Sequence, residues 1–307
     1  MKMILACDES GAKGYADRDE QFPGELGLFA GLLVPDEALS RAESALEAAI
    51  APYRGGDGKL HITDLTPQQQ NGLRTGIFQA IVDLKLPCFW YAIHVAGFHA
   101  FHRDMQNIAE QAREELKAAN PNPRIKRGSP RANPESLHAA LFTGLYGHIV
   151  AFIEERKPGP IEIEVRTDRV DAPIAQLFRE KAEELLHEGP KTYVATGYDT
   201  VDKSVVTGEI RSEIRYPPEF QIVTTVDELK VVSVGDEDPL VVAADVLANS
   251  LLHHFRQRNG DALYAELNRP HAILGHPLQA QLDSFGSWGG SDMADRLYRH
   301  PKAPRPN

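Results

Sequence analysis

The sequence predicts an α/β protein in which a mixed β-sheet carries helices packed on its faces. Two apolar runs, residues 3–7 and 26–35, open the chain with a polar stretch between them, which is typical of an antiparallel hairpin. Farther along, apolar runs of strand length alternate with segments of helical periodicity. A hairpin followed by alternating helices and strands favours a mixed sheet, because helices must bury their apolar stripes against it.

In the first half of the chain, the elements are expected in a clear order. Residues 36–53 and 67–84 carry apolar side chains at helical spacing, and both segments predict helices. The apolar run 88–98 predicts a strand, and the polar segment 103–119 predicts another helix. Residues 120–135 contain several prolines and basic residues, so we expect a basic Pro-rich loop there without regular structure.

The second half continues the same alternation. We expect helices at 134–156, 172–188 and 236–257, and strands at 161–168, 192–200 and either 219–226 or 229–234. The closing helix has Asp238 before Pro239, which is a typical helix start. Beyond Leu267, the frequent Pro, Gly and His residues predict irregular structure. We therefore expect a single domain over residues 1–268, followed by an irregular C-terminal extension over 269–307.

Composition restricts where the protein acts. The chain has 307 residues and two cysteines, Cys7 and Cys88, each inside an apolar run, which argues against a disulfide framework and for the reducing cytoplasm. The apolar start is too short for the hydrophobic region of a signal peptide. The longest apolar stretch, residues 137–153, is interrupted by His138 and His148, so we expect a buried helix and no membrane span.

The charge distribution limits the possible nucleic-acid partners. A net charge of −11 disfavours indiscriminate binding of duplex DNA, which depends on a basic excess. Two local segments are nevertheless basic, namely the tail at 296–305 and the Pro-rich loop. The candidate nucleic-acid contacts in the loop are Arg124, Lys126, Arg127 and Arg131. We expect a selective nucleic-acid partner, with RNA or single strands favoured, and the alternative is that these residues are solvated loop charges.

Carboxylates stand at the ends of two predicted strands and inside one predicted helix. Asp8 and Glu9 follow the first apolar run, and Asp168 closes a later strand, with Asp171 three residues beyond it. Functional groups in α/β sheets collect where strands end. If the strands of Asp8 and Asp168 are parallel neighbours, both carboxylates reach one rim of the sheet. A helix packed across that rim could then add Asp245.

Asp245 is the most informative of these residues. Its neighbours in the helix are almost all apolar, and a lone buried carboxylate costs several kcal/mol unless it is paired or bound to a cation. Asn249 follows one turn later on the same stripe and is a candidate accessory group. Converging carboxylates need a cation, and hard oxygen ligands suit Mg²⁺ or Mn²⁺. The alternatives are a hydrogen-bonded core acid for Asp245 and turn positions for the others.

Four short segments carry a resemblance to a known family. They are CDESG at 7–11, KLHITDL at 59–65, VRTD at 165–168 and AADVLANSL at 243–251. In this order they resemble the domain of unknown function 3800 family, whose members are regarded as ribonuclease-H-like. The resemblance implies a ribonuclease-H-like mixed sheet and a Mg²⁺ or Mn²⁺ site built from Asp8, Asp168 and Asp245. One departure is Val242, which stands where the family often has glutamine.

The implied chemistry is hydrolysis of a nucleic-acid phosphodiester, in which metal ions activate water and stabilise the leaving oxygen. We therefore expect a divalent-metal-dependent nuclease with Asp8, Asp168 and Asp245 as catalytic metal ligands. Possible accessory residues are Glu9, His61, Asp64, Asp171 and Asn249. The competing expectation is a catalytically inactive protein of the same fold that binds a protein partner or a second copy of itself.

Overall fold

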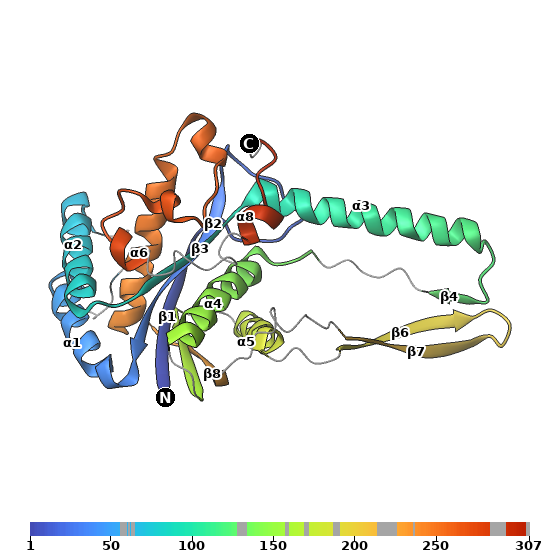
Figure 1. The fold of residues 1–307 in the computed structure, drawn as a ribbon, viewed down its shortest axis with the longest axis horizontal. Coiled ribbons are helices and arrows are strands. Elements are labelled where there is room, and N and C mark those ends of the chain that lie inside the picture. Colours follow the sequence, from blue (N-terminus) through green and yellow to red (C-terminus); the bar gives the residue numbers. More distant parts are fainter. Residues whose placement is uncertain are drawn as a thin grey trace.

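The structure is a computed structural model built around one central sheet. It describes residues 1–55, 60, 62, 65–127, 134–156, 160–168, 172–186, 191–213, 226–235, 237–282 and 293–304. The sheet has five strands in the order β3-β2-β1-β5-β8 (Figure 1). They are β1 (Lys2–Gly11), β2 (Leu26–Pro35), β3 (Cys88–His94), β5 (Ile161–Thr167) and β8 (Val226–Ser233). β3, β2 and β1 pair antiparallel, whereas β5 and β8 run parallel to β1, so the sheet is mixed and the fold class is α/β.

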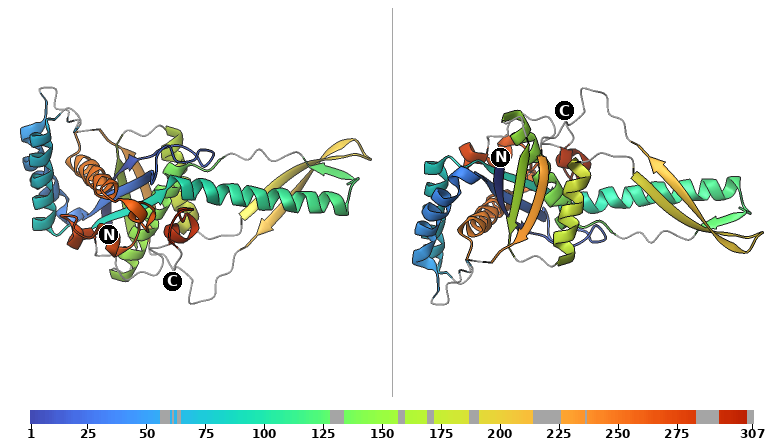
Figure 2. Two further views of the ribbon diagram at one scale, coloured as in Figure 1. Left: turned by 90° about the horizontal axis from the view of Figure 1, so that it is seen from above. Right: turned by 90° about the horizontal axis from the view of Figure 1, so that it is seen from below.

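Helices cover both faces of this sheet (Figure 2). One face carries α1 (Leu39–Ile50), α2 (Pro67–Leu84) and α6 (Pro239–Arg256), and the other carries α4 (Leu137–Arg156) and α5 (Ala172–Leu186). Because successive side chains of a strand point to opposite faces, β1 contributes to both layers. Ile4 and Ala6 belong to the core with α6, while Leu5 and Cys7 belong to the core with α4.

Local signals explain where two helices of the α6 layer begin. Thr66 and Gln69 exchange side-chain and backbone hydrogen bonds, which form the capping box of α2. Asp238 caps α6, because its Oδ1 accepts hydrogen bonds from the N–H groups of Leu240 and Val241 at 2.9 and 3.3 Å. Both helix starts lie at the positions expected from the sequence.

The opening hairpin is confirmed, but the next strand ends earlier than expected. β1 and β2 pair from Met3 to Gly11, so Asp8 and Glu9, which were expected at the end of the first strand, lie inside it. The strand continues there because β2 supplies a paired partner for these residues. The strand expected at 88–98 ends at His94, where α3 (Val95–Ala119) begins. His94 pairs with Leu26, the first residue of β2, so the partner strand does not extend beyond this point.

A second, smaller sheet extends away from the body beside α3 (Figure 1). It has the order β4-β6-β7, and its longest strands, β6 (Lys191–Asp199) and β7 (Ser204–Ser212), form a hairpin. β6 matches a predicted strand, whereas β7 is not among the predicted ones. β4 (Ile125–Arg127) corrects part of the expected loop, because it pairs with residues 197–199. Pairing is possible there because the prolines at 121 and 123 precede the strand and do not interrupt it.

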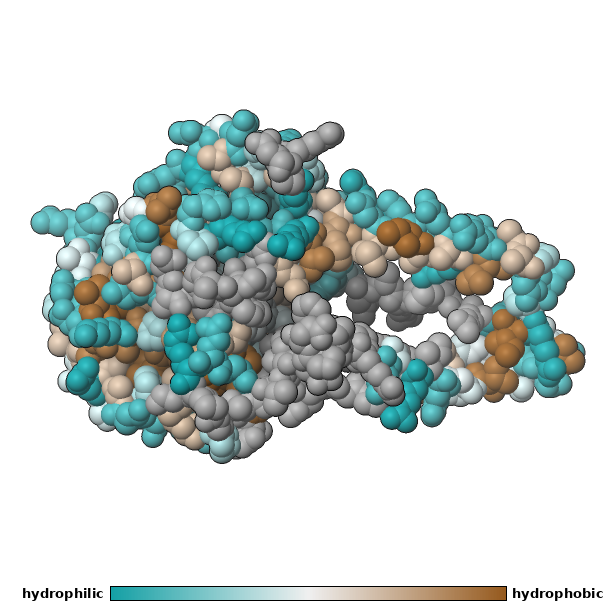
Figure 3. Space-filling model, in the orientation of Figure 1, coloured by the Kyte–Doolittle hydropathy of each residue, from teal (hydrophilic) through white to brown (hydrophobic). Residues whose placement is uncertain are grey.

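We call α3, β4, β6 and β7 the arm. From Arg103 onward the residues of α3 are exposed to solvent. Large apolar side chains of the arm are also exposed, namely Met105, Ile108, Leu116, Ile125, Val194, Tyr198 and Val205. Figure 3 shows apolar patches on the α3 side of the arm and near its far end. The arm therefore presents more apolar surface than a solvated helix and hairpin require.

The C-terminal extension packs against the body. In its described part, short helices η6 (Pro270–Ile273), α7 (Gln279–Leu282) and α8 (Met293–Leu297) interrupt the irregular structure expected there. Just before it, Asn268 accepts a hydrogen bond from the Ala92 N–H and donates one to the Ala92 carbonyl, both at 2.8 Å. Because β3 is an edge strand, Asn268 occupies the place of a partner strand.

One helix of the described chain, α4, has a length and composition that would also suit a membrane span. Its large apolar side chains, including Phe142, Leu145 and Ile149, are buried in the core that it shares with β1 and α5. A core helix that is buried on several sides has the same composition, so the apolar character of α4 is explained by its packing.

We predict that Asn268→Ala destabilises the protein by about 2–4 kcal/mol, because it leaves the buried N–H and C=O of Ala92 without partners. Urea denaturation measures the change in the free energy of unfolding. Asn71→Ala, at an exposed position of α2, is the matched control and should change it by less than about 0.5 kcal/mol. Equal effects of the two substitutions would contradict this role of Asn268.

Candidate functional site

Asp8 and Asp168 each follow the last paired residues of two neighbouring parallel strands, at one rim of the sheet. Their strands, β1 and β5, are adjacent and parallel, as the sequence analysis required. The register pairs Cys7 with Thr167. The residues that follow them, Asp8 and Asp168, are therefore at the same level along the two strands. This is the edge at which the carboxyl ends of the parallel strands meet, where functional groups of α/β proteins collect.

Asp245 approaches the same rim from the helix layer. Asp8 follows Ile4 and Ala6 on the face of β1 that packs against α6. Asp245 is half-buried in the middle of α6, and its negative charge acts on the carboxyl of Asp8. The two carboxyls therefore lie within electrostatic reach of each other across the contact between sheet and helix.

The carboxyl of Asp8 is strongly perturbed. Its side chain is buried, and burial is the main reason why its pKa is raised. The charges of Glu9 and Asp245 raise the pKa further, to about 9. At neutral pH, Asp8 therefore holds a proton unless a cation takes the place of that proton.

Glu9 points to the opposite layer and has the opposite behaviour. Burial would raise its pKa, but the ion pair with Lys13 and the nearby His138 lower it below the ordinary value. His138 comes from α4, and its Nε2 lies 3.7 Å from Glu9 Oε2. The carboxyls of Asp8 and Glu9 also interact directly through a side-chain hydrogen bond, which raises the pKa of Asp8 and lowers that of Glu9, so the proton resides on Asp8.

Lys13 connects the carboxylates electrostatically. Burial lowers its pKa, but the fields of Glu9, Asp8 and Asp168 together raise it above the ordinary value. The Lys13 ammonium therefore lies where three carboxyls act on one positive charge. Sequence analysis missed this residue, although its position four residues after Glu9, beyond the end of β1, was a usable signal.

The donor chemistry of this cluster fits a hard divalent cation, since its candidate ligands are carboxylate oxygens. His138 Nε2 and Thr167 Oγ1, both on the α4 side of the rim, are buried and have no hydrogen-bond partner among the described residues. Buried unsatisfied atoms of this kind indicate a place for a water, an ion or a ligand. Nevertheless, within the described ranges no three His, Cys, Asp or Glu side chains are already arranged to hold a metal.

The structure leaves several predicted accessory residues without a description. Asn249 is half-buried one turn after Asp245 on α6, as its spacing requires. The other accessory candidates lie outside the described residues: His61, Asp64 and Asp171. Their roles remain predictions.

The basic segment has a different organisation from the one expected. Arg124 binds two carboxylates of the hairpin turn, with Nε 2.8 Å from Asp199 Oδ2 and Nη2 2.7 Å from Asp202 Oδ2. It therefore attaches β4 to the hairpin, and a phosphate contact by Arg124 competes with these bonds. Lys126 is exposed. Arg127 is described only by its backbone pairing with Gly197, and Arg131 lies outside the described residues.

Comparison with known proteins adds no relative to this description. No protein-family model matches the chain, and no curated protein matches it. The assignment of function therefore depends on the sequence motifs and on the geometry of the carboxylate cluster.

We predict that Asp8→Asn changes how stability depends on pH. The pKa of Asp8 is about 9 in the folded chain and about 3.9 in an unfolded chain. Between these values the folded state binds more protons, so the contribution of this group to stability is lost as the pH rises from about 4 to about 9. Asp8→Asn should therefore gain stability relative to the wild type over this range.

Urea denaturation in the presence of a chelator, at several pH values within that range, measures the difference. Asp17→Asn, at an exposed position in the loop between β1 and β2, is the control and should follow the wild type. A difference between Asp8→Asn and wild type that stays constant over the range would contradict the raised pKa.

Proposed function

We propose that the protein is a divalent-metal-dependent phosphodiesterase that hydrolyses nucleic acid, with RNA or single strands as the favoured substrates. The observation that carries this proposal is the convergence of Asp8 and Asp245, which come from β1 and α6 and interact electrostatically at the rim of the sheet. Asp168 ends the neighbouring strand at the same level. Asp8 and Asp245 come from distant parts of the chain, and a bound cation would relieve the repulsion between their charges.

Membership of the domain of unknown function 3800 family, with its ribonuclease-H-like fold, is part of this proposal. A central mixed sheet with helices on both faces is the architecture that the resemblance implies. The quoted motifs also supply the residues of the cluster, because CDESG contains Asp8 and AADVLANSL contains Asp245. The agreement in architecture and the agreement in motif residues are independent, because the first concerns the backbone topology and the second concerns individual side chains.

Asp8, Asp168 and Asp245 would hold Mg²⁺ or Mn²⁺ in this function. When bound, the ion supplies activation of water and stabilisation of the leaving oxygen. Lys13 is the charge that an entering cation must displace, because its ammonium now balances Glu9, Asp8 and Asp168. Glu9 remains ionised beside His138 and is placed to orient groups on the α4 side of the rim.

The proposed cellular setting is the cytoplasm. Cys7 and Cys88 are free and buried, and they belong to different cores on the two faces of the sheet. Two thiols separated in this way cannot form a disulfide without unfolding, so the fold requires no oxidising compartment.

The proposal predicts that Mn²⁺ binds the wild type and supports cleavage of single-stranded RNA. Asp245→Asn should abolish measurable Mn²⁺ binding in calorimetric titration and lower the cleavage rate on the order of 100-fold, because it removes a charge from the cluster. Lys13→Met should bind Mn²⁺ more tightly than the wild type, since the competing ammonium is absent. Equal Mn²⁺ binding by wild type and Asp245→Asn would overturn the metal site.

A second candidate function is that of a catalytically inactive interaction module. The observation that favours it is the apolar surface of the arm, where Met105, Ile108 and Leu116 are exposed on α3. Their spacing places them along one side of the helix, which suits packing against a helix of a second copy. Symmetric pairing of two arms would cover the same surface on both chains.

This second candidate predicts a dimer in light scattering at micromolar concentration. Ile108→Glu should shift the protein to a monomer, because it introduces a charge into the paired surface. Asn107→Glu, at an exposed position on the opposite side of the same helix, adds the same charge away from those side chains and should leave the dimer unchanged. A wild-type monomer at all accessible concentrations would exclude self-association of the arm.

A further inference from the structure

A cavity of about 520 Å³ lies where the C-terminal extension meets the end of β3. Its walls include His94, Tyr264, Arg269, Arg296, Arg299 and His300. None of these residues belongs to the carboxylate cluster. The volume is in the range of natural small-molecule sites and suits a ligand of about the size of a mononucleotide.

The cavity concentrates positive charge on a chain whose net charge is −11. Three arginines contribute to its walls. The guanidinium of Arg299 donates hydrogen bonds to the carbonyl oxygens of Ala303 and Pro304, which hold its position without neutralising its charge. A planar guanidinium fixed in this way can bind the oxygens of a phosphate.

The acidic residues of the cavity are engaged with other groups. Asp295 accepts hydrogen bonds from the backbone N–H groups of Leu267 and Asn268, both at 2.9 Å. Glu266 Oε2 lies 3.6 Å from Arg269 and 3.9 Å from His271. These contacts reduce the repulsion that the two carboxylates would exert on an anionic ligand.

His94 adds a buried acceptor to the wall. Only 4% of it is exposed, and its Nε2 lies 3.0 Å from the carbonyl oxygen of Ala265. A carbonyl can only accept, so Nε2 must carry the hydrogen and Nδ1 must be the acceptor. Nδ1 has no hydrogen-bond partner within the described part of the chain. Burial lowers the pKa of His94 to about 4, which keeps the ring neutral and Nδ1 available at neutral pH.

We propose that this cavity binds the phosphate monoester of a nucleotide, with the phosphate on the arginines and a hydroxyl or amino hydrogen of the nucleoside on His94 Nδ1. Tyr264 supplies an aromatic surface beside these groups, which suits a base or a sugar. Two sources share this chemistry, a free nucleoside 5′-monophosphate and the 5′-phosphorylated end of an RNA strand. Only the second source rests on the proposed nuclease function.

Calorimetry without divalent metal tests the proposal, with adenosine 5′-monophosphate, inorganic phosphate, and 5′-phosphorylated or 5′-hydroxyl RNA oligonucleotides as probes. We expect adenosine monophosphate to bind more tightly than inorganic phosphate, and the 5′-phosphate to strengthen RNA binding at least tenfold if the strand end is the ligand. Arg299→Gln should weaken binding about tenfold, as loss of a charged hydrogen bond does. His94→Gln should remove the advantage of the nucleotide over phosphate.

Arg113→Gln on the exposed part of α3 is the matched control and should bind like the wild type. Asp245→Asn should also bind normally, so a failure of the nuclease proposal is distinguishable from a failure of this one. Absence of binding by both phosphorylated probes would overturn the inference, as would equal binding by wild type and Arg299→Gln. Equal affinity for inorganic phosphate and adenosine monophosphate would overturn the role of His94.

Discussion

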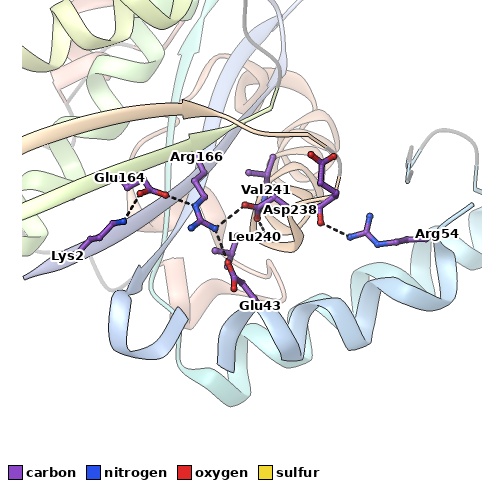
Figure 4. Close-up of polar contacts among 9 residues, drawn as sticks. Lys2, Glu43, Arg54, Glu164, Arg166, Asp238, Leu240 and Val241 are labelled. Carbon is purple, nitrogen blue, oxygen red and sulfur yellow. Dashed lines mark hydrogen bonds and ion pairs between the residues drawn. The ribbon is translucent and has the colours of Figure 1, made fainter. Parts of the chain in front are cut away.

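Arg166 holds together the elements that carry the candidate site. Its guanidinium lies 2.9 Å from Glu164 on β5, 2.9 Å from Glu43 on α1 and 3.1 Å from Asp238 at the start of α6 (Figure 4). Lys2 of β1 extends the network through Glu164 at 2.7 Å. Because Arg166, Glu164 and Asp238 are mostly shielded from water, their attraction is less screened than that of surface ion pairs. The network therefore determines where α6 begins relative to the sheet.

The position of Asp245 follows from this constraint. One oxygen of Asp238 binds Arg166, while the other caps the first turn of α6. Asp245 lies seven residues farther on, about two helical turns. Its height above the sheet is therefore set by an ion pair on β5, the strand that Asp168 directly follows. The same strand thus positions two of the three candidate ligands, and the register with β1 positions the third.

Neighbouring residues of β1 have different chemistry. Asp8 and Glu9 are adjacent in sequence, yet Asp8 meets a carboxylate from α6 and Glu9 meets His138 and Lys13. One pKa rises and the other falls. Charges from distant segments also meet at β3, the edge strand of the sheet. Its last residue, His94, lies in the wall of the basic cavity that the C-terminal extension forms. In both places the fold brings charges from distant segments together at the sheet.

The sequence alone determined the elements whose signals are local. The hairpin of β1 and β2, the start of α2 at Pro67 and the start of α6 at Asp238 depend on residues close in the chain, and the structure confirms them. The carboxylates could be named because an acid at a strand end or in an apolar helix is unusual by itself. Tertiary structure decided the end of β3, the pairing of β4, the counter-charge of Lys13 and the basic cavity. These depend on partners far away in sequence, such as Leu26 for His94 and Asp199 for Arg124, and no local pattern encodes which distant partner a strand end or a charge will meet.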